Sequence, residues 1–255
     1  MKSSLIFCGI LAFCLMIVFS AQAKINSADI VGLWLFDKEG DLSDYSGKGH
    51  DGKKDGNVKW TNGKFGMAIN LDGNSFVVVD HKDDMNLQTF TIMGWVNLAT
   101  APTDWWTIAC KDGWPNRNYG LWLASGTGLA HSSFTSGAAP DNNAVNAVTA
   151  VKAKEWYHVA GTYDMKTSIV YINAVADAKG SFTSKPNVTD VQFTIGRTAN
   201  GSYKINAMID EVALFNKALS ETDIKDIFTT GLKATATAIE SKNKLATTWA
   251  KVKSN

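Results

Sequence analysis

The sequence has few cysteines and few prolines, and it has no excess of charge of either sign. Of its 255 residues, three are cysteine and four are proline, and the formal net charge is +1. A chain so close to neutral has no strong attraction for nucleic acid or for an acidic membrane surface, so we expect neither partner. Cys110 lies in the apolar segment WWTIACK, where a buried thiol is expected.

The first 23 residues have the pattern of a signal peptide. Lys2 precedes an apolar stretch of about 15 residues, shorter than the roughly 20 that a membrane-spanning helix needs. The stretch ends in Ala-Gln-Ala, so cleavage is expected after Ala23, with an uncleaved anchor as the alternative. The mature protein would be secreted or extracytoplasmic, without a membrane span. Cys8 and Cys14 would leave with the signal, so no intrachain disulfide is expected.

Segments rich in Val, Ile, Thr and aromatic residues, separated by Gly, Asn and Asp, predict β-strands. They are residues 30–36, 66–71, 75–80, 89–98, 105–111, 119–125, 155–164, 167–173, 191–196 and 204–216. One short helix is expected after them, because Ser220 and Asp223 form a capping box and Gly231 supplies a stop. This pattern predicts an all-β antiparallel sandwich or barrel with one C-terminal helix. We expect one domain over residues 24–231 and a dispensable Ala/Thr/Lys-rich tail over 232–255.

Nine short segments follow one another in the order GLWLFD, DYSGKGHDGK, GKFGMAINLDG, SFVVVDH, FTIMGWVNLA, EWYHVAGTYD, SIVYINA, FTIGR and AMIDEVALFNKALSETDI. This order resembles the LamG-like jellyroll domains of the concanavalin A-like lectin/glucanase superfold, over about residues 30–230. The resemblance implies a jellyroll sandwich of two curved antiparallel sheets that binds carbohydrate or protein. The chain has Ala174 where the family's YVNG hairpin has glycine, so a different turn is expected there.

Common catalytic motifs are absent from the sequence: there is no G-x-S-x-G, H-E-x-x-H, Walker loop or G-x-G-x-x-G. His158 has no nucleophile motif beside it, so we interpret it as a buried histidine with its hydrogen bonds satisfied. Glycosidases of this superfold need two carboxylates on one strand face, whereas Asp210 and Glu211 are adjacent and should point to opposite faces. We therefore expect no catalysis, with a glycosidase or polysaccharide lyase as the alternative.

Aromatic residues favour a binding function. Trp114 is predicted to lie in a polar hairpin loop, and an exposed ring beside bidentate polar groups suits a sugar, whose apolar face stacks while its hydroxyls accept and donate hydrogen bonds. Trp106 and Trp122 lie inside strands and are expected to be packed. The predicted function is a secreted, non-catalytic glycan-binding module, and an adhesion or scaffold domain that recognises a cell-surface protein is a further alternative. The predicted ligand-binding residues are Trp114, Arg117, Asn116, Asp112 and Tyr119.

Asp210 interrupts the apolar segment AMIDEVALF, where alternation places it on the face of Met208, Val212 and Leu214. An unpaired buried carboxylate would cost several kcal/mol, so a partner is expected. One candidate is Arg197. The other is a structural calcium ion, which similar jellyroll domains often hold, and its predicted ligands are Asp37, Glu39, Asp41 and Asp210.

Overall fold

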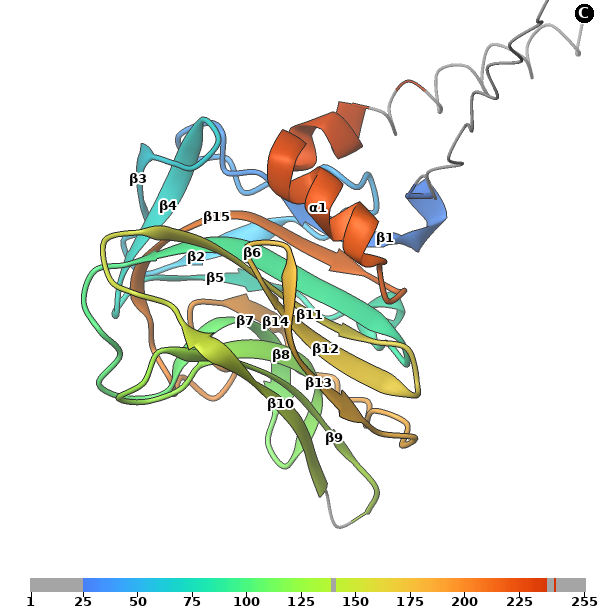
Figure 1. Ribbon diagram of the computed structural model, residues 1–255. Coiled ribbons are helices and arrows are strands. Elements are labelled where there is room, and N and C mark those ends of the chain that lie inside the picture. Colours follow the sequence, from blue (N-terminus) through green and yellow to red (C-terminus); the bar gives the residue numbers. More distant parts are fainter. Residues whose placement is uncertain (1–24, 139–140, 238–240, 242–255) are drawn as a thin grey trace, which may run out of the picture.

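The computed structural model describes residues 25–138, 141–237 and 241, and it consists mainly of β-strands (Figure 1). Two short 3-10 turns, η1 (Ser27–Asp29) and η2 (Asp83–Met85), and one helix, α1 (Glu221–Thr230), accompany them. The strands are β1 (Ile30–Trp34), β2 (Gly52–Asp55), β3 (Lys59–Asn62), β4 (Met67–Asp72), β5 (Phe76–Val79), β6 (Phe90–Leu98), β7 (Trp106–Gly113), β8 (Asn116–Leu123), β9 (Leu129–Ser136), β10 (Asp141–Ala150), β11 (Trp156–Tyr163), β12 (Thr167–Ile172), β13 (Val175–Ser181), β14 (Phe193–Ile195) and β15 (Asn206–Phe215).

The strands form two sheets. The eight-stranded sheet has the order β13-β12-β11-β6-β15-β4-β3, and β1 also pairs with β15. The seven-stranded sheet has the order β10-β9-β8-β7-β14-β5-β2. All of these strand pairs are antiparallel. The two sheets pack face to face, which confirms the predicted two-sheet jellyroll sandwich.

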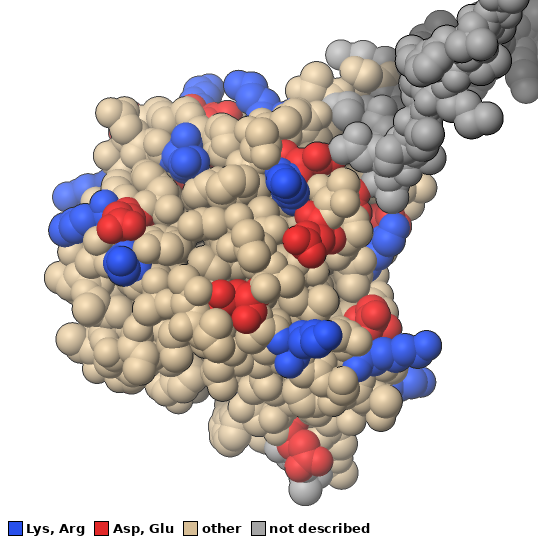
Figure 2. All heavy atoms as spheres, in the orientation of Figure 1, with Lys and Arg blue, Asp and Glu red and all other residues tan. Residues whose placement is uncertain are grey.

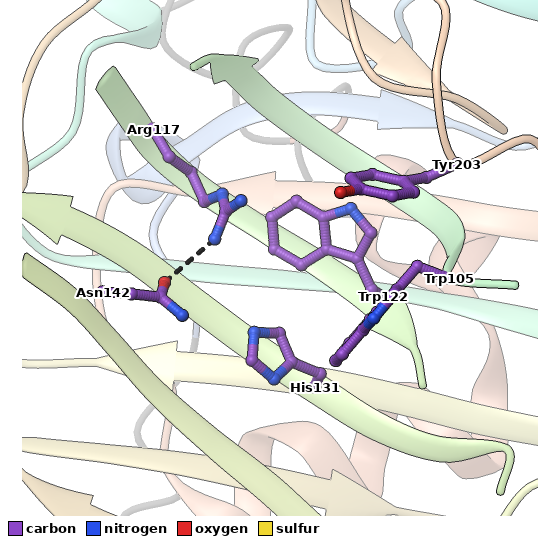
Figure 3. A pocket seen from close by; sticks show the side chains of 6 residues that line it. All are labelled: Trp105, Arg117, Trp122, His131, Asn142 and Tyr203. Atoms are coloured by element: carbon purple, nitrogen blue, oxygen red, sulfur yellow. Dashed lines mark hydrogen bonds between the residues drawn. The ribbon is translucent and has the colours of Figure 1, made fainter. Parts of the chain in front are cut away.

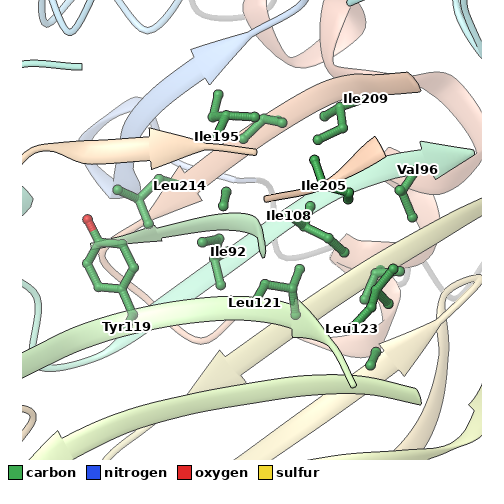
Figure 4. Close-up of a cluster of buried hydrophobic side chains, with 14 of the residues drawn as sticks. Ile92, Val96, Ile108, Tyr119, Leu121, Leu123, Ile195, Ile205, Ile209 and Leu214 are labelled. Atoms are coloured by element: carbon green, nitrogen blue, oxygen red, sulfur yellow. The ribbon is translucent and has the colours of Figure 1, made fainter. Parts of the chain in front are cut away.

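The main apolar core lies between the two sheets. Because side chains alternate along a strand, every second residue of β6 and of the second half of β8 points into this space. Figure 4 shows part of this core, including Ile92, Val96, Leu121, Leu123, Ile209 and Leu214, all of which are fully buried. The buried thiol of Cys110 is confirmed as well, and burial raises its pKa to about 12.

Helix α1 covers the outer face of the eight-stranded sheet (Figure 1). It begins with the predicted capping box, in which Ser220 Oγ accepts a hydrogen bond from the backbone N–H of Asp223 at 3.1 Å. Ile224 and Ile227 pack on a second apolar cluster that includes Phe215 of β15. Among the described residues, no helix covers the outer face of the seven-stranded sheet, although outward side chains such as Trp122 are buried there.

All ten predicted strand segments contain strands of the structure, but five strands were missed: β2, β3, β9, β10 and β13. Four of the five lie at the ends of the two sheets. End strands are half-exposed and carry polar residues, as the sequence DNNAVNAVTA of β10 illustrates. Their composition therefore does not produce the apolar signal by which the other strands were recognised.

The hairpin between β12 and β13 keeps a two-residue turn despite Ala174. Asn173 has φ +50° and Ala174 has φ +64°, as a type I′ turn requires. The expectation of a different turn is therefore wrong. The alanine adopts the left-handed conformation that glycine would adopt without strain.

The domain continues beyond the predicted boundary at Gly231. Residues 232–237 are helical, Leu232 is fully buried, and its backbone N–H donates a hydrogen bond to Glu211 Oε2 at 2.8 Å. The first six residues of the predicted tail thus belong to the folded domain. The predicted signal peptide with its cleavage at Ala23 lies outside the described residues, as does most of the tail.

Lys and Arg side chains are interspersed with Asp and Glu side chains over the face shown in Figure 2. This distribution agrees with the near-neutral composition of the chain. Within the part of the chain that the structure describes, no helix is long and apolar enough to cross a membrane.

Candidate ligand-binding site

A cavity of about 160 Å³ lies on the outer face of the seven-stranded sheet (Figure 3). Alternation on β8 explains its position, because Tyr119, Leu121 and Leu123 point into the core while Trp122 points outward. Side chains of β8, β9 and β10 meet there with two residues that lie outside the strands. The lining residues are Trp105, Arg117, Trp122, His131, Asn142 and Tyr203.

Trp122 forms the floor of the cavity. Its ring lies over Gly120, where an added Cβ would collide with the ring. The guanidinium carbon of Arg117 lies 4.4 Å from the ring centroid, within cation–π distance. Only 2% of Trp122 is exposed, so the ring supports its neighbours rather than offering its face to a ligand. Trp106 is buried as well, which confirms that both tryptophans are packed.

Arg117 is neutralised by Asp112. Its Nε and Nη2 each lie 3.1 Å from Asp112 Oδ2, and both residues are buried. Nη1 donates to Ser133 Oγ at 2.7 Å and to Asn142 Oδ1 at 3.0 Å. These four bonds engage four of the five N–H groups of the guanidinium, which fixes its position on the tryptophan floor.

His131 is held in one tautomer. Its Nδ1 lies 2.7 Å from Asn146 Oδ1, and because an amide oxygen only accepts, Nδ1 carries the proton of the neutral ring. Burial lowers the pKa of His131, so the ring is neutral at pH 7. Its Nε2 is then a hydrogen-bond acceptor.

Two aromatic rings of the cavity reach solvent. Trp105 is partly exposed and meets the His131 ring edge-on, with ring centroids 4.9 Å apart. Tyr203 is 40% exposed, and its backbone is tied to β7 because its carbonyl accepts a hydrogen bond from Thr107 N at 2.8 Å. These two rings are the aromatic surfaces that a ligand in the cavity would meet.

The structure keeps four of the five predicted ligand-binding residues in the β7–β8 hairpin, where Asp112 accepts hydrogen bonds from Trp114 N and from Arg117. Trp114 lies at the tip of the β7–β8 hairpin and is 66% exposed, and Asn116 Oδ1 accepts a hydrogen bond from Asn187 Nδ2 at 2.9 Å. Asp112 and Arg117 form the buried pair described above. Tyr119 is a correction, since it is fully buried and its hydroxyl donates to Met85 O at 3.0 Å. Alternation along β8 turns Tyr119 into the core, so it does not contact a ligand at the surface.

Four residues of the cavity were not predicted: Trp105, His131, Asn142 and Tyr203. His131 and Asn142 lie on β9 and β10, two of the strands that the sequence did not reveal. Tyr203 lies in the loop before β15, far from the other residues in sequence. The pair Trp105-Trp106 did carry a signal. Adjacent side chains of an extended segment point to opposite faces, so one of the two tryptophans must point outward.

The expectation that Asp210 and Glu211 point to opposite faces is wrong. A β-bulge interrupts the pairing of β15 with β6 between Asp210 and Ala213, and Glu211 has φ +47°. Asp210 Oδ2 accepts hydrogen bonds from the backbone N–H groups of Lys64 and Phe65, at 2.9 and 3.0 Å. The bulge also shifts the alternation, because Val212 and Leu214 belong to the core between the sheets and Asp210 does not.

The two carboxylates connect separate backbone segments to β15. Asp210 binds the segment before β4, and Glu211 binds the segment after α1. Burial raises the pKa of Asp210 to about 7 and that of Glu211 to about 8. Arg197 is not the partner of Asp210, because its Nη2 binds Asp55 Oδ2 at 2.6 Å. Asp210 Oδ1 has no hydrogen-bond partner among the described residues.

The four predicted calcium ligands do not form a common site. Asp41 accepts hydrogen bonds from Ser43 N and Tyr45 Oη, at 2.9 and 2.8 Å, and Glu39 is exposed. Only Asp37 lies near Asp210, on the other side of the segment around Gly66. Within the described ranges, no three His, Cys, Asp or Glu side chains are arranged to hold a metal ion. The residues present therefore do not fit the predicted four-carboxylate site.

His158 is buried as predicted, but its hydrogen bonds are not satisfied. The ring lies on the outer face of the eight-stranded sheet, beside Trp95 and beneath Phe228 of α1. Neither ring nitrogen has a hydrogen-bond partner among the described residues. Burial lowers the pKa of His158 to about 3, so it is neutral at physiological pH.

Solved structures with similar folds include two kinds of protein. Domain 4 of AbnA, a GH43 extracellular arabinanase from Geobacillus stearothermophilus solved with arabinotriose, has a TM-score of 0.63 at 21% identity, over 79% of this chain and 99% of that one. The binding domain of Paraclostridial Mosquitocidal Protein 1 has a TM-score of 0.66 at 14% identity, over 79% of this chain and 52% of that one.

A structure of botulinum neurotoxin type C, whose cell entry depends on interaction with two ganglioside molecules, has a TM-score of 0.64 at 15% identity, over 80% of this chain and 51% of that one. This chain spans about half the length of the two toxin chains. At such low identities these structures show a shared fold, and a search of curated proteins finds no match.

The sequence profile of the concanavalin A-like lectin/glucanases superfamily matches residues 71–225, more than half of the chain. The chain therefore belongs to the concanavalin A-like lectin/glucanase superfamily.

Proposed function

We propose that this protein is a secreted, non-catalytic module that binds a glycan in the cavity on the seven-stranded sheet. The single observation that carries the proposal is the pairing, in one cavity, of the exposed rings of Trp105 and Tyr203 with the hydrogen-bonding groups of His131 and Asn142. A sugar stacks its C–H face on an aromatic ring while its hydroxyls bind polar groups. The buried network around Arg117 holds this arrangement rigid, so little conformational entropy is lost on binding.

The similar structures support the same reading, because one was solved with arabinotriose and another belongs to a toxin that interacts with gangliosides. Extracellular proteins are among them, which agrees with the signal peptide expected from the sequence. The alternative of catalysis has little support from Asp210 and Glu211, because backbone N–H groups bind both carboxylates and both residues are buried.

The test is a glycan array with the wild-type protein and with the variants Trp105→Ala and Tyr203→Ala. Each variant should weaken glycan binding about tenfold or more, because a stacked aromatic at the centre of a site contributes about 1–3 kcal/mol. Their urea-unfolding curves should stay close to wild type, since both rings are exposed or partly exposed.

Trp114 provides the matched control, because it is an exposed aromatic ring at the tip of the β7–β8 hairpin and does not line the cavity. If Trp114→Ala removes binding while the two cavity variants bind normally, the site is the hairpin originally predicted from the sequence. If no glycan binds at all, the proposal fails, and the exposed Trp114 then favours the alternative of a module that recognises a cell-surface protein.

A further inference from the structure

The cavity presents polar groups but no free charge. Arg117 is the one cationic residue that lines it, and Asp112 neutralises Arg117 from a buried position. One guanidinium N–H is left over after the four hydrogen bonds, so the fork that would bind a carboxylate in a bidentate way is already occupied. An acidic sugar would have to lose its hydration without gaining a matching ion pair.

Other charged groups near the cavity do not change this balance. His131 is neutral at pH 7 because burial lowers its pKa. The charged residues next in sequence to the lining residues are Asp104, Asp141 and Lys204, all exposed. Two of these three are acidic, so together they add no net positive charge beside the lining residues.

A donor and an acceptor remain available in the cavity. Arg117 only donates, so the atom of Asn142 that it binds is the amide oxygen, which leaves the Nδ2 group of Asn142 as a donor. His131 donates through Nδ1 to Asn146, which leaves its Nε2 as an acceptor. Figure 3 shows Asn142 and His131 on the same side of Trp122, and in the strand register His131 lies opposite Asn146, four residues along β10 from Asn142. Two hydroxyl groups of one sugar match these groups, because one can accept from Asn142 and the other can donate to His131.

The size of the cavity restricts the ligand further. At about 160 Å³ it is smaller than the roughly 300–1,000 Å³ of pockets that enclose drug-sized molecules. It has room for one sugar ring, stacked on Trp105 or Tyr203, and not for several.

From this geometry we infer that the site selects an uncharged sugar ring through two of its hydroxyl groups and discriminates against uronic and sialic acids. The inference rests on the proposed function and names the ligand class of the same site. It follows from the neutralised guanidinium, the free amide group of Asn142 and the acceptor nitrogen of His131.

Isothermal titration calorimetry with the full chain can test this inference with galactotriose and trigalacturonate, two trisaccharides that differ mainly in charge, and with arabinotriose as a second neutral probe. At least one neutral trisaccharide should bind about tenfold or more tightly than trigalacturonate. Its affinity should be equal in about 50 mM and 500 mM NaCl, because no ion pair is formed.

Two substitutions test the named atoms. Asn142→Asp keeps the oxygen that Arg117 binds but replaces the free donor with an acceptor, so neutral-sugar affinity should fall about tenfold. Asp112→Asn keeps one acceptor oxygen for Arg117, loses the oxygen that accepts from Trp114 N and leaves the guanidinium charge uncompensated, so trigalacturonate affinity should rise several-fold. Urea unfolding of each variant shows whether the fold is kept. His131→Phe removes the acceptor Nε2 together with the Nδ1 donor to Asn146, and it tests the acceptor independently if either variant does not fold.

The possible failures are distinct. Equal or tighter binding of trigalacturonate by the wild type would overturn the selection of neutral sugars and leave glycan binding intact. Neutral binding that neither Asn142→Asp nor His131→Phe weakens would overturn the assigned donor and acceptor. Absence of binding to any glycan on the array would overturn the proposed function itself, and the ligand class with it.

Discussion

Substituting His158 with phenylalanine should make the protein more stable, and increasingly so as the pH falls. The imidazole lies between Trp95 and Phe228, with ring centroids 5.3 and 6.0 Å away, so a phenyl ring of similar shape can replace it. Neither ring nitrogen has a hydrogen-bond partner among the described residues. Removing these unsatisfied groups should stabilise the fold at pH 7.5 by about 1 kcal/mol or more.

The dependence on pH follows from the pKa of His158, which burial lowers from 6.5 to about 3. Below pH 6.5 the unfolded chain binds a proton that the folded protein does not, so this histidine destabilises the fold as the pH falls toward 3. At pH 4.5, two units below the unfolded value, the penalty is about 2.7 kcal/mol, since each unit is worth about 1.36 kcal/mol. The figure at pH 4.5 is independent of the folded pKa as long as that pKa lies below about 4.

Urea unfolding followed by tryptophan fluorescence at pH 7.5, 6.5, 5.5 and 4.5 provides the assay. The free energy of unfolding of His158→Phe minus that of wild type should grow by about 2.7 kcal/mol between pH 7.5 and 4.5. A difference that stays constant within about 0.5 kcal/mol over this range would refute the reasoning, because the pKa of His158 would then be the same in the folded and unfolded states.

His50 provides a control of opposite sign. Although burial acts to lower the pKa of His50, hydrogen bonds to Asp44 and Asp84 outweigh it, and the pKa is raised. The stability that His50 contributes is therefore fully present below pH 6.5 and is lost as the pH rises through its folded pKa. The loss of stability in His50→Gln should accordingly be larger at acidic pH than at alkaline pH.

Four further outcomes are expected, each measured by melting or urea unfolding. The calcium site expected from the sequence is tested by chelation: with Asp41 and Glu39 directed elsewhere, about 1 mM calcium should leave the melting temperature unchanged, whereas a rise that Asp210→Asn removes would show that Asp210 binds the metal. A chain that ends at residue 237 should keep wild-type stability. A chain that ends at residue 231 lacks the buried Leu232 and should lose about 2–5 kcal/mol of stability. Equal stabilities of the two truncated chains would contradict this prediction. Ala174→Gly should stabilise the protein by about 0.5–1 kcal/mol, because glycine adopts the positive φ without strain. An absence of stabilisation would show that the turn differs in solution. Gly120→Ala should destabilise by about 1–3 kcal/mol because its Cβ meets the tryptophan floor, and an unchanged curve would show that the floor can move.

The strands of the interior could be recognised from the sequence because their signal is local. Segments such as FTIMGWVNL of β6 are buried on both sides and carry the apolar and β-branched residues that this environment requires. The capping box at Ser220 was equally readable, because its two hydrogen bonds join residues three positions apart. The order of these segments was sufficient to indicate the superfamily.

Only the tertiary structure decides which face of a strand some side chains occupy and which residues form the cavity. One bulge at Glu211 shifts the alternation of β15 by a residue, and no local pattern marks a bulge whose positive φ is adopted by a glutamate. Strands β2, β3, β10 and β13 lie at the ends of the sheets, and their positions follow from pairing with one neighbouring strand. Because end strands are half-exposed, their sequences lack the apolar pattern that indicates a strand. The cavity joins Trp105, Asn142 and Tyr203, which are far apart in sequence, and its charge balance depends on a buried contact between Arg117 and Asp112. Sequence reasoning assigns residue types to strands, whereas the relative position of side chains from different strands follows from sheet register and packing.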